Sequence, residues 1–512
     1  MPALPEQAST PDELIAIEGS HLYSPDLAPV PPERRKWGMW NFAALWISMA
    51  ACIPTYMLAS SLIDGGMNWW QAILTIFLAN LIVLIPMILN AHAGTRYGIP
   101  FPVFCRASFG THGANVPALL RALVACGWFG IQAWIGGNAI FKILAVFVPS
   151  LAATPAQNAF GITFPQFLCF MLFWGINMWV IYKGIDSIRL LLSFKAPLLI
   201  VLGLLLLGWA YSAAGGFGPM LSQPSAFDPG QPKDGQFWKY FVPALTGMIG
   251  FWATLSLNIP DFSRYAKSQR DQVLGQTIGL PPTMALYAFI GVAVTSATTI
   301  IFKKTIWDPV DVLTHFTNPF VLIIAMLALC IATLATNLAA NVVSPANDFA
   351  NLAPKFISFR TGGLITGIIG VLIMPWKLLA NPSGYIFTWL VGYSALLGPI
   401  GGIMIADYFL IRKCKLSLVD LYKPDGEYRY TKGFSLVGLF ALIVSILPNV
   451  PGFLATINVI PKDKLPPFLM TIYSYAWFVG FLIAFLLYSI LRSLAPAMKP
   501  LAGIKPSTPA LP

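Results

Sequence analysis

Long apolar runs alternate with short polar stretches along almost the entire chain. Each run is about 20 residues long, which is the length that an α-helix needs to cross the hydrocarbon core of a bilayer. The pattern predicts an all-α polytopic membrane protein with twelve transmembrane helices. The twelve runs begin near Trp40, Trp69, Val116, Phe164, Ala196, Phe241, Gly279, Pro319, Gly362, Tyr385, Phe434 and Phe468.

The composition agrees with this interpretation. Of the 512 residues, 57% are hydrophobic and only 10% are charged, whereas a soluble chain carries roughly a quarter charged residues. The net charge of +11 comes from Lys and Arg residues scattered singly among the loops, without a basic stripe. We therefore expect the lipid bilayer as a partner and no nucleic acid.

The distribution of basic residues predicts the orientation. If the N-terminus is cytoplasmic, most of the 31 Lys and Arg residues fall in cytoplasmic segments, as the positive-inside rule requires. We expect a multi-pass protein of the cytoplasmic (inner) membrane with both termini in the cytoplasm. Residues 1–36 are polar, rich in proline and without a secretory signal, and predict a solvated cytoplasmic tail. Residues 495–512 form the second predicted tail.

Two spans that lie five spans apart are interrupted by proline. The first reads Cys52-Ile53-Pro54, and the sixth contains Trp252 and then Pro260. Because an odd offset reverses the orientation, broken helices at corresponding positions indicate an inverted repeat with its site at the midplane. The alternative is that these prolines and the nearby glycines only kink the spans or allow close packing.

The third span carries an aromatic and an amide residue on one helix face. Trp128 and Gln132 lie one turn apart and project from the same side. An indole offers a stacking surface and an amide offers a donor and an acceptor, which together suit a planar ring with an amide edge. Trp252 could supply the second stacking face. The alternative is that these tryptophans mark a membrane interface.

The eighth span is dense in small and amide residues. Thr336 and Asn341 lie about 140° apart around the helix, so that one could face an ion and the other a substrate. Asn337 fits equally well as a hydrogen-bonding residue between helices. Lys195, in the fifth span, could be a buried cation that replaces sodium or moves a proton, or it could extend to the interface.

The remaining charged and motif positions limit the function classes. The carboxylates Asp261, Asp348 and Asp407 fall at predicted helix ends, which favours a cap or interface role. No phosphate-binding loop, zinc-protease helix or nucleophile elbow occurs in the sequence. We expect no enzyme activity and no cofactor, and the energy for transport would come from an ion gradient.

Several motifs together resemble the nucleobase-cation symport family, which contains purine, cytosine, uracil, allantoin and hydantoin permeases. The resemblance covers residues 25–490 and implies a five-plus-five inverted-repeat (LeuT-like) fold plus two C-terminal helices. It implies repeats at 37–215 and 216–411, with the two additional helices at 412–494. The motifs are Pro32-Glu33-Arg34-Arg35, Tyr97 to Pro102, Trp128 to Gln132, Asn258 to Phe262, and Ala339-Ala340-Asn341.

The resemblance also implies roles for individual residues. By similarity to the hydantoin transporter of the family, Trp128 and Trp252 would sandwich the substrate, and Gln132 and Asn341 would hydrogen-bond its edge. Cys52 stands where that relative has a glutamine. These residues would form a substrate site for a small heterocycle.

Two further features of the resemblance concern specificity and the ion. Phe251 stands where the hydantoin transporter has a glycine. The chain as a whole also resembles the plant plastid nucleobase transporters and the bacterial allantoin permeases of the family, which implies uracil, other nucleobases and allantoin as candidates. A sodium site would map to main-chain groups of Ser48, Ala51 and Ala332 and to the hydroxyl of Thr336. The position of its second hydroxyl is an alanine here, and a hard-cation site depends on its number of oxygens.

The expected function is therefore secondary active symport. The substrate would be a nucleobase or a related heterocycle such as uracil, allantoin or a hydantoin-like compound, and the coupling ion a proton or sodium, with the proton favoured. Two alternatives on the same fold are an uncoupled facilitator and a substrate-sensing membrane receptor. The sequence leaves the oligomeric state open, and a monomer is plausible.

Overall fold

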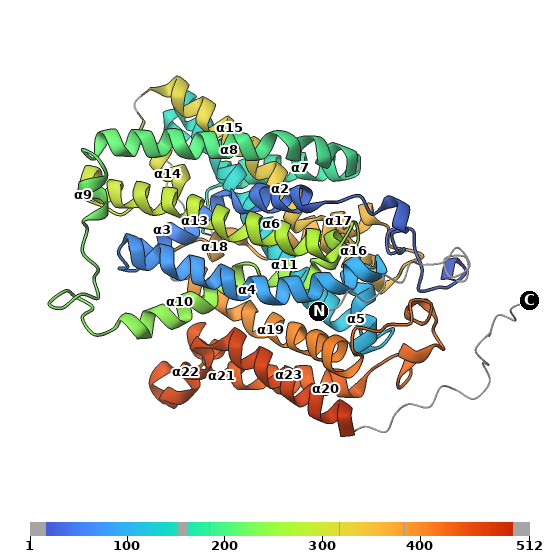
Figure 1. Ribbon diagram of the computed structural model, residues 1–512. Helices are drawn as coiled ribbons and strands as arrows, with labels where there is room; N and C mark the ends of the chain where they lie inside the picture. Colours follow the sequence, from blue (N-terminus) through green and yellow to red (C-terminus); the bar gives the residue numbers. More distant parts are fainter. Residues whose placement is uncertain (1–16, 152–160, 184, 317, 382–383, 495–512) are drawn as a thin grey trace, which may run out of the picture.

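The computed structural model is a bundle of long, roughly parallel helices (Figure 1). It describes residues 17–151, 161–183, 185–316, 318–381 and 384–494, with the backbone alone along 185–197. The first 16 residues of the predicted N-terminal tail and the whole predicted tail 495–512 lie outside this part.

The first half of the bundle begins with the helix pair α2 and α3. The helices of this half are α2 (Met39–Ala50), α3 (Ile53–Asp64), α4 (Trp69–Tyr97), α5 (Phe101–Phe109), α6 (Asn115–Phe147), α7 (Phe164–Lys183), α8 (Ile185–Ala213) and α9 (Phe217–Leu221). The next group contains α10 (Phe237–Phe251), α11 (Ala253–Asn258), α12 (Pro260–Ser263), α13 (Gln269–Phe302), α14 (Pro309–Leu313), α15 (Pro319–Asn341), α16 (Val343–Leu352), α17 (Phe359–Leu372) and α18 (Pro375–Leu378).

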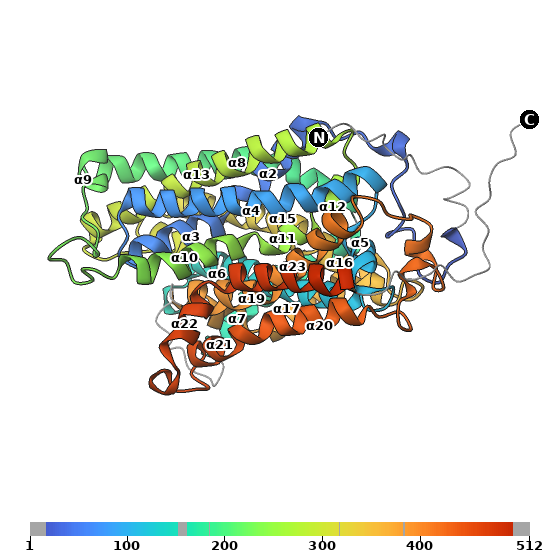
Figure 2. The ribbon, with the colours of Figure 1, turned by 60° about the horizontal axis from the view of Figure 1, so that its bottom comes forward.

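The last part of the chain includes two π-helical segments that flank a single α-helix. It contains η3 (Gly384–Leu390), α19 (Val391–Ile405), η4 (Ala406–Ile411), α20 (Leu436–Ile446), η7 (Leu447–Asn449), α21 (Val450–Thr456), α22 (Pro467–Ser474) and α23 (Ala476–Leu494). Helices α19, α20 and α23 pack together along one flank of the bundle (Figure 2).

The predicted spans coincide with these helices. Among the described residues, eight helices are long and apolar enough to cross a membrane, and the pair α2 and α3, bent by 56°, makes a ninth. The other three predicted spans fall on α8, on α10 with α11, and on α17, whose described apolar parts are shorter. All twelve predicted spans are therefore helical.

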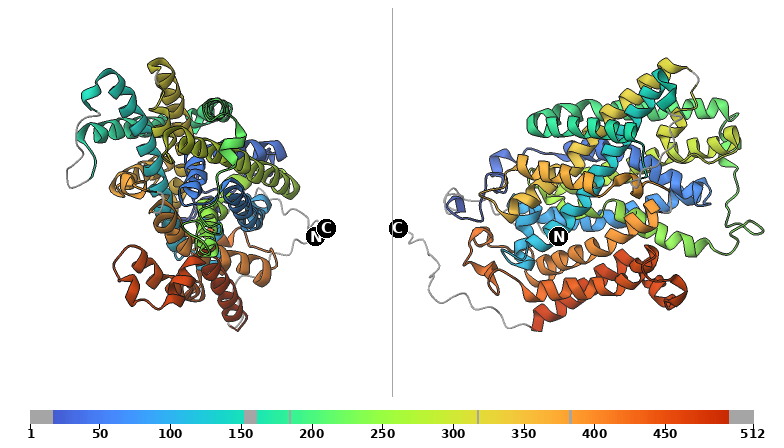
Figure 3. Two further views of the ribbon diagram at one scale, coloured as in Figure 1. Left: turned by 90° about the vertical axis from the view of Figure 1, so that its left-hand side faces the viewer. Right: turned by 180° about the vertical axis from the view of Figure 1, so that it is seen from behind.

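The contacts divide most helices of the bundle into two groups, and the left view of Figure 3 looks along the bundle. In the first group, α2 and α3 pack against α13, and α10 to α12 pack against α4, which itself contacts α13. In the second group, α7 and α15 to α17 pack around α6. The two groups meet through α2 and α15 and through α11 and α6. The division into two repeats at 37–215 and 216–411 stays a prediction.

Glycine allows the close approach of α6 and α17 in the second group. A Cβ atom built on Gly130 would lie 2.3 Å from the carbonyl oxygen of Gly370, and one on Gly370 would lie 2.8 Å from the Phe129 ring. Membrane helices commonly use small residues at such contacts because apolar side chains gain little by leaving lipid. This contact fixes α6, which carries Trp128 and Gln132, against its neighbours.

The described part of the predicted N-terminal tail, from position 17 onward, is only partly solvated. Leu22, Leu27 and Val30 are buried, and the Tyr422 hydroxyl donates a hydrogen bond to the Leu27 carbonyl at 2.7 Å. The segment is mostly polar, so its composition did not predict that a few of its apolar side chains are buried near the loop after η4. The segment therefore covers one end of the bundle, called here the N-terminal end.

A buried arginine on α5 holds this end together. Arg106 donates to the Leu421 and Leu22 carbonyls, both at 3.0 Å, and to the Asn351 side-chain oxygen at 2.6 Å. Burial lowers the pKa of Arg106 to about 10, so the guanidinium remains charged at neutral pH. It joins α5, α16, the N-terminal segment and the loop after η4.

The predicted interface role of the three carboxylates is also wrong, because Asp261, Asp348 and Asp407 are all buried. Asp348 lies inside α16 and forms an ion pair with Arg121 at 2.9 Å, with both side chains fully buried. Asp261 does act as a cap, but for another helix, since it accepts the backbone N–H of Phe101 at the start of α5 at 2.9 Å. These partners are far apart in sequence, so the sequence pattern does not reveal them.

Candidate substrate-binding site

Two helix breaks come together in the middle of the bundle. Between α2 and α3, Ala51 and Cys52 leave the helical conformation, with φ and ψ of −75° and 87° for Ala51 and −151° and 161° for Cys52. Pro54, the second residue of α3, lacks the N–H that a continuous helix would need. Trp252 separates α10 from α11 with φ −103° and ψ 5°. The prediction of interrupted first and sixth spans is confirmed.

A small cavity of about 30 Å³ lies at these breaks. It collects all six predicted substrate residues and also Thr336 from the candidate sodium site. Its walls belong to both helix groups. The lining residues are Met49, Cys52, Pro54, Trp128, Gln132, Phe251, Trp252, Thr254, Leu255, Thr336, Ala340 and Asn341.

Three aromatic rings form one wall of the cavity. The ring centroids of Trp128 and Phe251 are 5.2 Å apart, and those of Phe251 and Trp252 are 4.9 Å apart, each pair at nearly right angles. Trp252 also contacts Trp46 edge-on at 5.3 Å. Phe251 therefore stands between the two tryptophans that were predicted to sandwich a substrate. A flat ligand needs that ring to move aside.

Two polar atoms of the cavity walls have no hydrogen-bond partner within the described part of the chain. They are the side-chain oxygen of Gln132 and the indole N–H of Trp252. Gln132 is only 4% exposed. A buried polar atom without a partner costs about 1–3 kcal/mol, and a ligand that bonds it recovers part of that free energy. The unpaired atoms thus point to a polar ligand with both donor and acceptor groups.

Asn341 lies at the end of a chain of asparagine side chains. Its amide N–H donates to the Asn337 oxygen at 3.0 Å, and Asn337 donates to the Phe129 carbonyl and to Asn177 on α7 at 3.2 and 3.1 Å. Asn337 is therefore a residue that joins helices. These bonds fix the orientation of Asn341 at the cavity wall, where α15 ends and α16 begins.

Sequence reasoning missed Tyr393 on α19. Its hydroxyl accepts the Trp128 indole N–H at 3.3 Å and donates to the Gly250 carbonyl at 2.8 Å. The tyrosine thus holds Trp128 against the end of α10, where Phe251 and Trp252 follow. Trp128 and Tyr393 are 265 positions apart, and a tyrosine inside an apolar run carries no signal of this contact.

The candidate sodium site has Thr336 as its one side-chain hydroxyl, beside the main-chain groups of Ser48, Ala51 and Ala332. The Thr336 hydroxyl donates to the Ala332 carbonyl at 2.9 Å, so two of the four candidate groups already bond each other. Thr336 lines the cavity, while Ser48, Ala51 and Ala332 are not among its lining residues. Ala335 supplies no hydroxyl. Lys195 lies in the stretch whose side chains are outside the described part, so both interpretations of it stay predictions.

The comparison with protein families decides the class. The family model described as permease for cytosine/purines, uracil, thiamine, allantoin matches residues 29–480. The chain belongs to this family of nucleobase-cation-symport permeases. It is a membrane transporter and not an enzyme.

Similar proteins and solved structures agree with the assignment to this permease family. The chain is 47% identical over 474 residues to a purine-uracil permease of Arabidopsis thaliana, covering 92% of this chain and 78% of the relative. It is 41% identical over 481 residues to an allantoin permease of Bacillus subtilis, covering 94% and 95%.

Among solved structures, it resembles Mhp1, a transporter of the same family in a closed conformation with bromovinylhydantoin bound. The TM-score is 0.74 with 26% identity, covering 92% of this chain and 95% of that chain. MhsT in complex with L-phenylalanine, at TM-score 0.50 and 17% identity, shares the fold and covers 87% of this chain and 98% of its own. These likenesses confirm the predicted LeuT-like fold.

Proposed function

We propose that this permease is a secondary active symporter that imports a planar nucleobase-like heterocycle, with uracil, allantoin and hydantoin-like compounds as candidates. The observation that carries the proposal is the cavity in which Trp128, Trp252, Gln132 and Asn341 converge. The two indoles provide stacking surfaces, and the two amides provide donors and acceptors. Relatives named as purine-uracil and allantoin permeases support this substrate class.

The size of the cavity supports transport by alternating access. A volume of about 30 Å³ holds little more than one water molecule, so this conformation is closed around the site. Cys52, Phe251 and Trp252 come from the first helix group, and Trp128 and Asn341 from the second. Rocking of one group against the other would enlarge the site and open it to one side at a time.

We propose a proton rather than sodium as the coupling ion. Only one of the two hydroxyl positions of the candidate sodium site carries an oxygen, at Thr336, and that hydroxyl bonds the Ala332 carbonyl. Because hard cations are held by the number and arrangement of oxygen ligands, the site is weak. An ion gradient still supplies the energy, and the proton is the remaining common coupling ion.

We also propose that the N-terminal end of the bundle is cytoplasmic and that the membrane is the inner membrane. Arg96, Arg264 and Arg412 lie at or just beyond helix ends on this side, and Arg106 lies in the short helix α5 that follows α4. The positive-inside rule places such residues in the cytoplasm.

Uptake into liposomes containing the purified protein tests the function and the ion together. We expect radiolabelled uracil to accumulate above its external concentration under an inward proton gradient, to be lost with a protonophore, and to be unchanged when choline replaces sodium. Unlabelled allantoin, hydantoin, cytosine and adenine then rank the substrate class. Accumulation that needs sodium would overturn the proton assignment.

The same assay separates the two alternatives on this fold. Saturable flux that only reaches equilibrium under every gradient identifies an uncoupled facilitator. Tight uracil binding without any flux identifies a receptor. Neither binding nor flux of any of these heterocycles would overturn the substrate class and leave the permease fold unchanged.

A further inference from the structure

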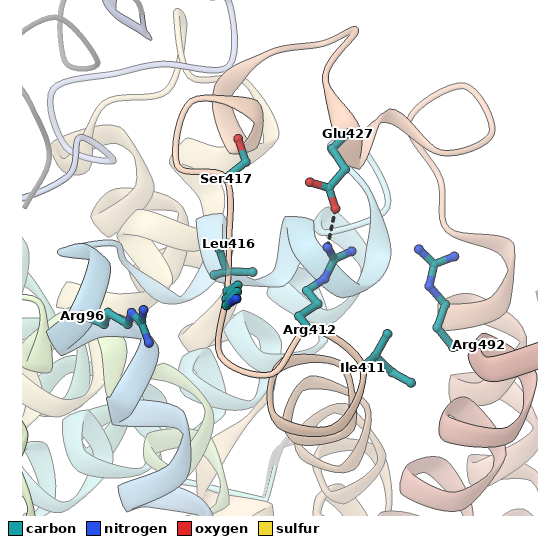
Figure 4. Close-up of a pocket in the computed structure, with 8 residues that line it drawn as sticks. Arg96, Ile411, Arg412, Leu416, Ser417, Glu427 and Arg492 are labelled. Atoms are coloured by element: carbon teal, nitrogen blue, oxygen red, sulfur yellow. Dashed lines mark hydrogen bonds and ion pairs between the residues drawn. The ribbon is translucent and has the colours of Figure 1, made fainter. Parts of the chain in front are cut away.

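A second, larger pocket lies at the N-terminal end of the bundle, away from the central cavity (Figure 4). Its volume is about 660 Å³. Four basic side chains line it, together with a single acidic one, Glu427. The basic residues are Arg96, Arg412, Lys415 and Arg492.

One of the four cations is already bonded to several groups of the protein. Arg412 forms ion pairs with Asp407 at 2.8 Å and with Glu427 at 2.5 Å, and it also donates to the Tyr430 hydroxyl and the Ala107 carbonyl. Burial lowers the pKa of Arg412, but Asp407, Glu427 and the two neighbouring tyrosines Tyr430 and Tyr428 together raise it above its ordinary value. Arg412 therefore organises the pocket, and four of its five N–H groups already donate within the protein.

The other three cations keep their charges available. Within the described ranges, neither Arg96, Lys415 nor Arg492 takes part in an ion pair. Arg96 is only 8% exposed, and its buried Nε–H has no hydrogen-bond partner among the described residues. The Arg492 guanidinium lies over the Tyr430 ring, 5.0 Å from its centroid. A buried guanidinium with an unused donor is costly unless an anion binds it.

The pocket lies where three membrane helices end. Arg96 is the last residue but one of α4, Arg412 follows directly after η4, and Arg492 is two residues from the end of α23. In Figure 4, Arg96 and Arg492 lie on opposite sides of Arg412. Ile411 lines the pocket, and the neighbouring Leu410 is 51% exposed. The site thus combines cations with an adjoining apolar surface.

We propose that this pocket binds the phosphate headgroup of an anionic phospholipid, with Arg96, Lys415 and Arg492 as its ligands. Basic pockets between membrane helices are suited to anionic headgroups at this depth. The apolar surface at Leu410 and Ile411 fits an acyl chain, which a free phosphate does not have. A bound lipid would tie α4 of the first helix group to α23 on the flank and stabilise the closed N-terminal end.

Melting of the full-length purified protein in detergent tests this assignment, with phosphatidylglycerol, phosphatidylcholine or inorganic phosphate added. We expect phosphatidylglycerol alone to raise the melting temperature, and native mass spectrometry to find it bound. The triple variant with Arg96→Gln, Lys415→Gln and Arg492→Gln should bind it roughly 100-fold more weakly, since each cation contributes about five-fold. Lys415→Gln alone changes an exposed side chain and should weaken binding about five-fold.

A matched control removes three exposed cations outside the pocket at the same end of the bundle, with Lys267→Gln, Arg270→Gln and Lys355→Gln. This control should respond to phosphatidylglycerol as the unmodified chain does. The proposal is overturned if the control and the triple variant lose the response equally, or if the unmodified chain shows none. Equal stabilisation by inorganic phosphate would identify a soluble anion and rule out a lipid.

Discussion

Two regions of this permease that contain buried polar side chains differ in how completely those side chains are bonded. At the central cavity, the Gln132 oxygen and the Trp252 indole N–H have no partner among the described residues. Around Asp407, both carboxylate oxygens are bonded, one by Tyr488 at 2.8 Å and the other by Arg412 at 2.8 Å. The bonded cluster stabilises the fold, whereas the open positions are available to a ligand.

The largest effect should come from breaking the bonded cluster. Asp407→Asn leaves the buried Arg412 guanidinium with only the half-exposed Glu427 as a charged partner. We expect a loss of about 3 kcal/mol in stability, measured as thermal or denaturant unfolding in detergent.

The matched control for this cluster is Asp311→Asn. Asp311 pairs with Lys142 at 3.3 Å at a partly exposed site, where an ion pair contributes less than about 1 kcal/mol. The KM for uptake by the Asp407→Asn molecules that remain folded should match the unmodified chain. Equal loss of stability in both variants would remove the distinction between the two regions.

At the central cavity we expect the reverse, a large effect on transport and a small effect on stability. Asn341→Ala should raise the KM for the substrate by at least roughly tenfold, because a site built to hydrogen-bond its ligand discriminates strongly once a partner is lost. Stability should fall by only about 1 kcal/mol. Asn80→Ala, a buried amide on α4 outside the cavity, is the control in uptake and melting assays. If Asn341→Ala transports normally, Asn341 is structural like Asn337.

A smaller effect concerns the ring that separates the two tryptophans. Phe251→Gly frees space between Trp128 and Trp252, so bulkier heterocycles such as 5-substituted hydantoins should compete several-fold better for uptake. The KM for uracil should change less. Phe251→Leu should give an intermediate ranking of competitors. An unchanged ranking in both variants would mean that Phe251 does not limit the size of the substrate.

The smallest effect is expected at the candidate sodium site. Thr336→Ala removes a hydroxyl that already bonds the Ala332 carbonyl, so uptake should fall by less than about three-fold. Its dependence on the proton gradient should stay unchanged in liposomes. If this substitution abolished uptake that depends on sodium, the coupling ion would have to be reassigned.

The sequence predicted the features that depend on local pattern. Apolar run length located all twelve helical spans, and Pro54 and the Trp252 region marked the interrupted ones. The helix period placed Trp128 and Gln132 on one face, and both line the cavity. These predictions succeed because each depends on neighbours within a few turns.

The features that the sequence missed depend on distant partners. Tyr393 bonds Trp128 across 265 positions, and Arg121 pairs with Asp348 across 227. A charged residue at an apparent helix end looks the same whether it faces water or a buried partner. The position of Phe251 between the tryptophans depends on its contact with Trp128 on α6, which no periodicity specifies.

The most direct test of the central claim is the initial rate of radiolabelled uracil uptake by cells that express Trp128→Ala. Trp179→Ala, the same change on an exposed side of α7, is the control, and the amount of each protein in the membrane is measured in parallel. Since stacking on an aromatic ring contributes about 1–3 kcal/mol per base, we predict that Trp128→Ala loses saturable uptake while Trp179→Ala retains it. Uptake by Trp128→Ala with unmodified kinetics would contradict the assignment of the central cavity as the substrate site.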